Sequence, residues 1–349
     1  MKLSRVCHFA GQVLHKPRTF SGIQPTGTVH LGNYFGAVQK WVNEVKSAKT
    51  EDHDRIFSVV DLHAITMPQN PQELRENILT MTASLLGCGL DAKKAILFQQ
   101  SHVDEHAQLC WILGTLSTVN SLKRLSQYKD KSKGMKETPL GLFLYPVLQA
   151  ADILAYKATD VPVGEDNLQN VEMCRRLAHS FNNRFNSQIF PLPNAVLVSE
   201  TSSRRIRSLR DPSKKMSKSD VDKKSCLYIL DEPDTIRMKL KRAVTDMTSQ
   251  VTFNPDERPG VSNLVCIHSQ ITNQDPSEIC QEVSNMDTGQ YKLYLADILI
   301  EHLSPIREKT KDLLENKDHI EAILIDGADR ARLIAAQTLK EVNKAVGLH

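Results

Sequence analysis

Two loops, far apart in the sequence, carry the residue types that bind phosphate groups. The first is FSGIQPTGTVHLGN at residues 20–33, which we call the glycine loop, and a helix is expected to follow it. Gly22, Gly27 and Gly32 let the backbone approach a ligand closely, and the free N–H groups at the helix start attract anions. His30 can add a side-chain hydrogen bond. The pattern is neither GxGxxG nor a Walker loop, so it does not identify a nucleotide site alone.

The second loop, residues 211–220, contains KKMSKSD, and we call it the lysine loop. Lys215 and Lys218 flank Met216 and Ser217. Most charged runs are solvated surface, and that interpretation stays open here. Two lysines on a mobile loop can instead close over a polyphosphate and offset the charge that develops on a leaving pyrophosphate.

A parallel α/β sheet is expected to position these loops. Residues 55–65 (RIFSVVDLHAI) and 94–101 (KAILFQQS) are short β-branched runs that end in polar residues, as buried parallel strands do. The helical pattern between them completes a βαβ unit, whose right-handed crossover puts both strands in one sheet. Doubly wound sheets bind ligands at the carboxyl ends of their strands, where His63 should lie. Residues 194–200 predict a further strand.

A buried carboxylate is expected in the apolar helical stretch 137–156, which Pro146 should break. Asp152 lies deep in the apolar register of this stretch, between Ala151 and Ile153. The acid could point outward from the helix. Its apolar neighbours favour a partly buried carboxylate that needs a hydrogen-bond donor.

The chain is expected to form a Rossmann-like, doubly wound parallel sheet domain with a helical insertion, followed by a helical domain. The sheet domain covers residues 20–224, and the insertion covers about 104–185. Residues 225–349 are helical, and the last helix should pack back on the sheet domain. One face of that helix carries Ala331, Ile334, Ala335, Thr338, Leu339 and Val342.

Both loops resemble the paired signature motifs of the class I aminoacyl-tRNA synthetases. HLGN at residues 30–33 stands for the HIGH motif of that class, with Asn33 in place of the second histidine, and KMSKS at residues 215–219 is the second motif. Further matching segments follow in order: VDLHAIT, YPVLQAADILAY, VPVGEDN, SLRDPSKKMSKSD and AVTD…PGVSNL. Together these segments resemble tryptophanyl-tRNA synthetases of the bacterial and mitochondrial type, from about Phe20 to the C-terminus.

The resemblance implies an ATP-dependent ligase that activates L-tryptophan and transfers it to the 2′-hydroxyl of the terminal adenosine of tRNA(Trp). It implies ATP as a substrate with Mg²⁺, without a tightly bound cofactor or structural metal. It also implies a homodimer formed through the helical insertion, and anticodon recognition by residues 225–349. Basic residues at 123–136 and 204–210 are candidates for contacts with tRNA phosphates, with a solvated surface as the alternative.

The resemblance also assigns site residues, motif by motif. The implied catalytic residues are His30, Asn33, Lys215 and Lys218. The residues implied for ATP binding are Gln24, Pro25, Thr26, His30, Gly32, Asn33, Lys131, Gly164, Glu165, Asp166, Ile206, Lys215, Met216, Ser217, Lys218 and Ser219. The residues implied for tryptophan binding are Phe20, His63, Gln149, Asp152, Ile153 and Asn167.

Asp152 is implied to accept the indole N–H, since indole offers a single donor and an ionised carboxylate only accepts. Gln149 and Asn167 stand where many bacterial relatives have Met and where they usually have Gln, so the roles of these two positions stay open. A tyrosyl-tRNA synthetase is one alternative, although those enzymes typically show GGxDQ where this chain has VGEDN. A non-catalytic nucleotide- or RNA-binding relative is the other, and the intact HLGN and KMSKS motifs argue against it.

The composition excludes several classes of protein. The chain has 349 residues, 40% of them hydrophobic, and its 44 basic and 41 acidic residues are too balanced for a histone-like binder. No apolar run approaches a membrane span, so no membrane partner is expected. Seven cysteines without CxxC pairing favour reduced thiols. His102 and His106 in HVDEH have helical spacing, but the order is not HExxH and a third ligand is lacking, so two helix-face histidines are favoured over a metal site.

Residues 1–19 carry basic residues but no carboxylate, and the first acidic residue is Glu44. Basic, acid-free amphipathic leaders resemble organellar transit peptides, and a disordered N-terminus is the alternative. With a bacterial-type body, this leader predicts the mitochondrial matrix. The bacterial cytoplasm is the alternative location.

Overall fold

The computed structural model describes most of the chain, in the ranges 15–47, 53–197, 206–218, 220 and 222–348, apart from the side chains of residues 130 and 131. Several predictions therefore lie outside the described residues. They concern most of the leader, Ser219, the Lys131 side chain, and Arg204 and Arg205 of the second basic segment.

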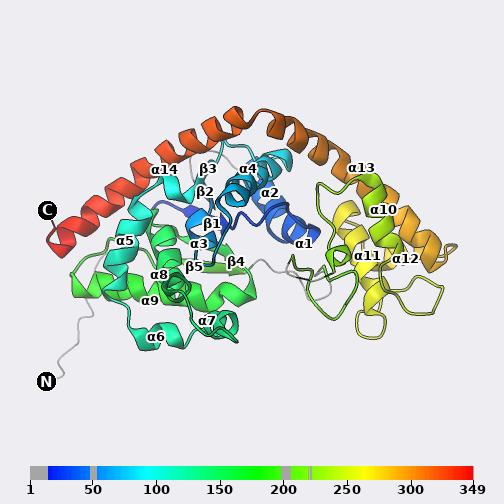
Figure 1. Cartoon of the computed structure of the whole chain (residues 1–349), viewed down its shortest axis with the longest axis horizontal. Coiled ribbons are helices and arrows are strands. Elements are labelled where there is room, and N and C mark those ends of the chain that lie inside the picture. The colour runs from blue at the N-terminus through cyan, green and yellow to red at the C-terminus, as the bar shows by residue number, and fades with distance from the viewer. Residues whose placement is uncertain (1–14, 48–52, 198–205, 219, 221, 349) are drawn as a thin grey trace, which may run out of the picture.

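A five-stranded parallel sheet in the order β3-β2-β1-β4-β5 forms the centre of the molecule (Figure 1). Its strands are β1 (Arg18–Ile23), β2 (Asp54–Val59), β3 (Ile96–Gln99), β4 (Asp160–Val163) and β5 (Asn194–Leu197). The chain fills the sheet outward from β1 to β3 and then returns to the other side of β1 with β4. This reversal confirms the predicted doubly wound fold and creates a switch point between β1 and β4.

Successive side chains of the strands point to opposite faces of the sheet and pack into two hydrophobic cores, one on each face. Phe57 and Leu97 point into the first core, which they share with Trp41. Ile56 and Phe98 point into the second core. Since both faces are covered there, β2 and β3 are buried along most of their length, which explains their continuous apolar runs, whereas β5 at the edge of the sheet is exposed.

The first core is covered by helices that follow the glycine loop and β2. The glycine loop leads into α1 (Leu31–Asn33), which continues through the π-helical turn η1 (Tyr34–Val38) into α2 (Gln39–Ser47). After β2 come the short α3 (Asp61–Ala64) and the long α4 (Pro71–Gly87). Asn70 caps α4 by accepting hydrogen bonds from the backbone N–H groups of Gln72 and Glu73.

The segment predicted as a helical insertion covers the second core. After the short η2 (Gln100–His102), it contains α5 (Glu105–Gly114), α6 (Val119–Lys123), α7 (Ser126–Ser132), α8 (Leu140–Ala155) and α9 (Leu168–Arg184). The predicted break at Pro146 is wrong, because α8 runs through Pro146 as one helix. A proline inside a helix loses one backbone hydrogen bond and crowds the carbonyl four residues earlier. The packing of α8, which is buried along most of its length, offsets this cost. Strand β4 of the central sheet also lies within this interval, between α8 and α9.

The C-terminal part is helical. Its elements are η5 (Lys223–Ser225), α10 (Pro233–Lys241), α11 (Pro259–Thr272), α12 (Pro276–Glu282), α13 (Thr288–Glu315) and α14 (Lys317–Val346). In Figure 1, α13 and α14 form one long arc that runs from the α10–α12 cluster across the sheet. Helix α14 packs so tightly on β3 that a Cβ atom at Gly327 would lie 1.8 Å from the carbonyl oxygen of Leu97. Within the described ranges, every helix is too short or too polar to cross a membrane.

Candidate active site

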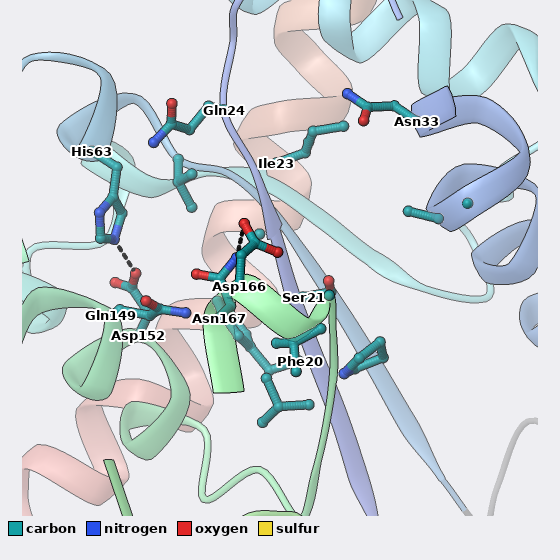
Figure 2. Close-up of a pocket in the computed structure, with 18 of the residues that line it drawn as sticks. Phe20, Ser21, Ile23, Gln24, Asn33, His63, Gln149, Asp152, Asp166 and Asn167 are labelled. Carbon is teal, nitrogen blue, oxygen red and sulfur yellow. Dashed lines mark hydrogen bonds and ion pairs between the residues drawn. The ribbon is translucent and has the colours of Figure 1, made fainter. Parts of the chain in front are cut away.

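A cavity of about 870 Å³ opens at the switch point of the sheet, where β1 and β4 end. The predicted site residues that line it are Phe20, Gln24, Gly32, Asn33, His63, Gln149, Asp152, Ile153, Gly164, Glu165, Asp166, Asn167 and Lys215. Figure 2 shows His63 and Asp152 pointing toward each other at one side of this cavity, with Asn33 at the opposite side. The cavity therefore has two ends, one at α3 and α8 and the other at α1.

His30 forms the start of α1 and does not line the cavity. The segment around it is held in place by backbone hydrogen bonds between Leu31 N and Leu227 O (2.9 Å) and between Ile229 N and Val29 O (3.0 Å). The backbone N–H of Asn33 donates to Nδ1 of His30 (3.3 Å), as at a helix N-cap. Because Nδ1 accepts, the proton of the neutral ring must be on Nε2.

Burial lowers the pKa of His30 to about 4, and the positive charges of Lys218 and Lys215 add to this effect. The imidazole is therefore neutral at physiological pH, and its Nε2–H is a hydrogen-bond donor. Gly32 is required beside it, since a Cβ atom there would lie 3.0 Å from Cε1 of the His30 ring. The sequence order His-Leu-Gly-Asn thus produces one defined donor at the start of α1.

The lysine loop lies directly against the glycine loop. Nζ of Lys218 donates to the backbone oxygens of Thr26 and Gly27 (both 3.2 Å) and to Oγ1 of Thr26 (3.3 Å). Gly27 adopts a positive φ of 84°, which favours glycine at this turn. Burial lowers the pKa of Lys218 to about 8. Lys215 instead reaches the cavity wall.

The other predicted residues of the two loops lie outside the cavity wall. Ile206 and Met216 are buried and joined by a hydrogen bond from Met216 N to Ile206 O (3.4 Å). The Sγ of Cys226 donates to the backbone oxygen of Ser217 (2.9 Å). The members of the predicted ATP set that do not line the cavity are Pro25, Thr26, His30, Ile206, Met216, Ser217 and Lys218.

Asp152 is more buried and better satisfied than the sequence suggests. It is 1% exposed, and donors already surround both of its oxygens. Oδ2 accepts from Nε2 of His63 (2.8 Å), and Oδ1 accepts from Nδ1 of His106 (2.6 Å) and Nε2 of Gln100 (2.7 Å). Burial alone would raise the pKa of Asp152, but the hydrogen bonds from His106 and His63 outweigh it and hold the pKa below its ordinary value. The group is therefore a charged carboxylate in the cavity wall.

Two aromatic residues complete this end of the site. Nε2 of His106 lies 2.7 Å from the hydroxyl oxygen of Tyr156. The Tyr156 ring stacks on the ring of Phe20, with centroids 5.5 Å apart and planes at 12°. Phe20 and Asp152, which both line the cavity, are thus connected behind its wall. His102 and His106 were candidates for metal ligands, and in the described part of the chain three or more such ligands do not come together.

A polar network holds the wall formed by η3 (Glu165–Asn167). Gln149 accepts a hydrogen bond from Asn170 (2.9 Å), and Asn167 accepts one from Nε2 of Gln127 (3.2 Å). Gln127 in turn accepts from the hydroxyl of Tyr145 (2.7 Å). Gln127 and Tyr145 line the cavity but were missed from the sequence. Gln127 lies in the basic segment 123–136. The charged residues of this segment suggested contacts with tRNA phosphates, and nothing in the sequence marked the neutral Gln127 as a site residue.

Comparisons with known proteins agree with this geometry. Residues 14–304 match the family model for tRNA synthetases class I (W and Y). The chain is 44% identical to tryptophan–tRNA ligase 2 of Streptomyces avermitilis, over 95% of this chain and 97% of that protein. It is 42% identical to the mitochondrial tryptophan–tRNA ligase of Caenorhabditis elegans, over 95% and 92% of the two chains.

Solved structures of tryptophanyl-tRNA synthetases are also similar to this chain. The tryptophanyl-tRNA synthetase of Mycoplasma pneumoniae superimposes with a TM-score of 0.83 at 30% identity, over 96% of this chain and 99% of that one. The Campylobacter jejuni tryptophanyl-tRNA synthetase, solved in complex with ADP and tryptophan, superimposes with a TM-score of 0.82 at 31% identity, over 95% and 99% of the two chains. The chain therefore belongs to the class I tRNA synthetases for tryptophan and tyrosine, within the branch of the tryptophan–tRNA ligases.

Proposed function

We propose that the chain activates L-tryptophan with ATP and transfers the activated amino acid to tRNA(Trp). One observation carries this proposal: a single cavity has a buried carboxylate at one end and the HLGN helix start with Lys215 at the other. An amino acid bound at the carboxylate end would present its own carboxylate toward a nucleotide bound at the helix start. The names of the relatives, which describe tryptophan–tRNA ligases, support the same reaction.

Asp152 has room for one more hydrogen bond. A carboxylate offers about four acceptor sites, two on each oxygen. Gln100 and His106 use both sites of Oδ1, and His63 uses one site of Oδ2. The remaining site is on Oδ2, beside His63, which also lines the cavity. One open acceptor suits an indole ring, which has one N–H donor.

The activation step needs positioning and charge stabilisation rather than a protein nucleophile. The tryptophan carboxylate attacks the α-phosphorus in line, the bond from this phosphorus to the bridging oxygen breaks, and pyrophosphate leaves with the electron pair. Nε2–H of the neutral His30 can donate to the nucleotide. Lys215 and Lys218 offset the negative charge of the leaving pyrophosphate, for which Lys218 must leave its present partners on Thr26 and Gly27. Mg²⁺ bound to the substrate ATP would neutralise part of the phosphate charge.

In the second step the 2′-hydroxyl of the terminal adenosine of tRNA attacks the carbonyl carbon of the adenylate, the bond from this carbon to the phosphate oxygen breaks, and AMP leaves. We assign the remaining roles in ATP and tryptophan binding as the sequence motifs imply them. Contacts with tRNA phosphates are proposed for the basic segments 123–136 and 204–210, and anticodon contacts for residues 225–349. A variant that removes a phosphate contact should weaken binding to all tRNA sequences alike and reduce the salt dependence of binding.

A homodimer and a mitochondrial location are part of the proposal. Exposed apolar side chains near α3, α6 and α8 support a partner surface: Ile65, Val119 and Leu140 are 57%, 57% and 69% exposed. A monomer by sedimentation at micromolar concentration would contradict the dimer. The worm mitochondrial relative and the basic leader support the location. Import of a tagged chain into mitochondria, lost on removal of residues 1–19, would support it further, and import without the leader would contradict it.

ATP–pyrophosphate exchange in the presence of single amino acids tests the activation step. We expect exchange with tryptophan and at least 100-fold lower kcat/KM with tyrosine, because a site built to hydrogen-bond its substrate discriminates more strongly than an apolar pocket alone, for which the ratio is about 100-fold. Comparable exchange with tyrosine would indicate a tyrosyl-tRNA synthetase. No exchange with any amino acid would indicate a binding protein that has kept the fold.

A further inference from the structure

We infer that His106 is a positioning residue for amino-acid selection: its hydrogen bond to Oδ1 of Asp152 orients the carboxylate so that Oδ2 presents its open acceptor site to the cavity. The inference rests on the proposed function, because it takes the ring N–H of tryptophan as the donor that Oδ2 receives. His106 itself does not touch the substrate.

The identity of the bonding atom follows from the geometry. Nδ1 of His106 lies 2.6 Å from Oδ1, and an ionised carboxylate can only accept, so Nδ1 must carry a hydrogen. This holds whether the ring is neutral or charged. The other nitrogen, Nε2, bonds with the hydroxyl of Tyr156 (2.7 Å). Both ring nitrogens are therefore engaged, and the imidazole has one orientation.

The two oxygens of Asp152 are held by different parts of the fold. Oδ1 is held by Gln100, at the start of η2, and by His106 on α5. Oε1 of Gln100 accepts from the backbone N–H of Leu62 (3.1 Å), so its amide nitrogen must face Asp152. With both sites of Oδ1 filled, a donor from the substrate can reach only Oδ2. Loss of the His106 bond would open a second acceptor site on the wrong oxygen and free the carboxylate to turn.

The pair His106 and Tyr156 forms a rigid support behind the cavity wall. Both side chains are fully buried, at 0% exposure, so water does not compete for their hydrogen bond. Tyr156 stacks on Phe20, and Phe20 and Asp152 both line the cavity. Through these contacts, the position of the Asp152 carboxylate is fixed relative to the Phe20 ring. Fixed contacts of this kind make a hydrogen-bonding site selective, because the acceptor cannot shift to suit a substrate that lacks the donor.

Two matched variants separate this role from simple packing. In His106→Asn the amide nitrogen is as many bonds from Cα as Nδ1 is, so the bond to Asp152 is retained and the one to Tyr156 is lost. In His106→Gln the amide nitrogen is as many bonds from Cα as Nε2 is, so the bond to Tyr156 is retained and the one to Asp152 is lost. Both replace the ring by a polar amide, and because Asn is the smaller of the two, any packing defect would be larger in the variant that retains the bond to Asp152.

The readout is discrimination between tryptophan and its benzothienyl analogue, in which sulfur replaces the ring N–H. The kcat/KM of each is measured by ATP–pyrophosphate exchange with the full chain, and the ratio of the two values is compared between variants. We expect His106→Asn to keep the wild-type ratio and His106→Gln to lower it by about 10-fold, as loss of a well-placed hydrogen bond to a charged group produces. General loosening of the fold would reduce both kcat/KM values together and leave the ratio unchanged.

An unchanged ratio in His106→Gln, or an equal fall of the ratio in both variants, would overturn the inference. If the wild-type chain shows no tryptophan-dependent exchange, the proposed function itself is wrong. If the wild type is active and only the pattern of ratios differs from expectation, the function stands and His106 has no positioning role.

Discussion

We predict that the activity of the wild-type protein falls above pH 8 and that Lys218→Arg abolishes this fall. The ammonium group of Lys218 is partly buried between the lysine loop and the glycine loop, and this burial lowers its pKa to about 8. Raising the pH therefore removes the charge that the proposed reaction needs for the leaving pyrophosphate. An arginine at this position keeps its charge throughout the range, since the guanidinium does not deprotonate in proteins.

The size of the fall follows from the pKa. With a pKa of about 8, the charged fraction of Lys218 drops from about 0.9 at pH 7 to about 0.09 at pH 9, which is a tenfold loss. A lysine with an ordinary pKa would remain almost fully charged at pH 9. The environment of Lys218 thus predicts a large effect within a range where an ordinary lysine shows none.

The assay is tryptophan-dependent ATP–pyrophosphate exchange, with kcat/KM for ATP measured between pH 6.5 and 9.5, because kcat/KM reports groups of the free enzyme. Dividing the wild-type profile by the Lys218→Arg profile cancels the titration of the substrates, which is common to both. We expect the quotient to fall about tenfold from pH 7 to pH 9. A flat quotient would refute the assignment of the alkaline limb to Lys218.

Three substitutions test other parts of the structure. Asp152→Ala should raise the KM for tryptophan by about 10-fold or more in the exchange assay, because the substrate loses its acceptor and His63 loses its partner. Gly32→Ala should lower kcat/KM for ATP by about 10-fold, because its Cβ would push the His30 ring off the Asn33 N–H that it caps. Gly327→Ala should lower the free energy of unfolding by about 3 kcal/mol in denaturant titration, since its Cβ would overlap a backbone oxygen of β3.

For each of these three substitutions, one result would contradict the expectation. An unchanged KM for tryptophan would remove Asp152 from the amino-acid pocket. Wild-type kinetics with ATP in Gly32→Ala would mean that the orientation of the His30 ring does not matter. Unaltered stability of Gly327→Ala would contradict the close packing of α14 on the sheet.

The fold was predictable where local patterns carry it. The apolar runs before Asp61 and Gln100 identify β2 and β3, and the glycine loop identifies the start of α1. Boundaries were less accurate: the run at 55–65 contains most of β2 and the whole of α3, so His63 lies on a short helix. The helix break at Pro146 was wrong because sequence pattern does not show the packing that keeps α8 continuous.

The candidate site was predictable only in part. The hydrogen bonds that hold its residues in place were not predictable from the sequence. Many residues that line the cavity, His63 among them, belong to recognisable motifs, whereas the other two partners of Asp152 are brought to it by tertiary contacts. His106 and Gln100 are 46 and 52 residues from Asp152 in sequence, and periodicity carries no information over such distances. Gln127 was missed for the same reason, since its contacts with Tyr145 and Asn167 join separate helices.

Amino-acid-dependent ATP–pyrophosphate exchange by the purified chain tests the central claim most directly. The account predicts exchange that depends on tryptophan, that is not supported at comparable kcat/KM by tyrosine, and that is lost when both Lys215 and Lys218 are replaced by alanine. Exchange with tyrosine at a similar kcat/KM, or exchange that survives the loss of both lysines, would contradict it.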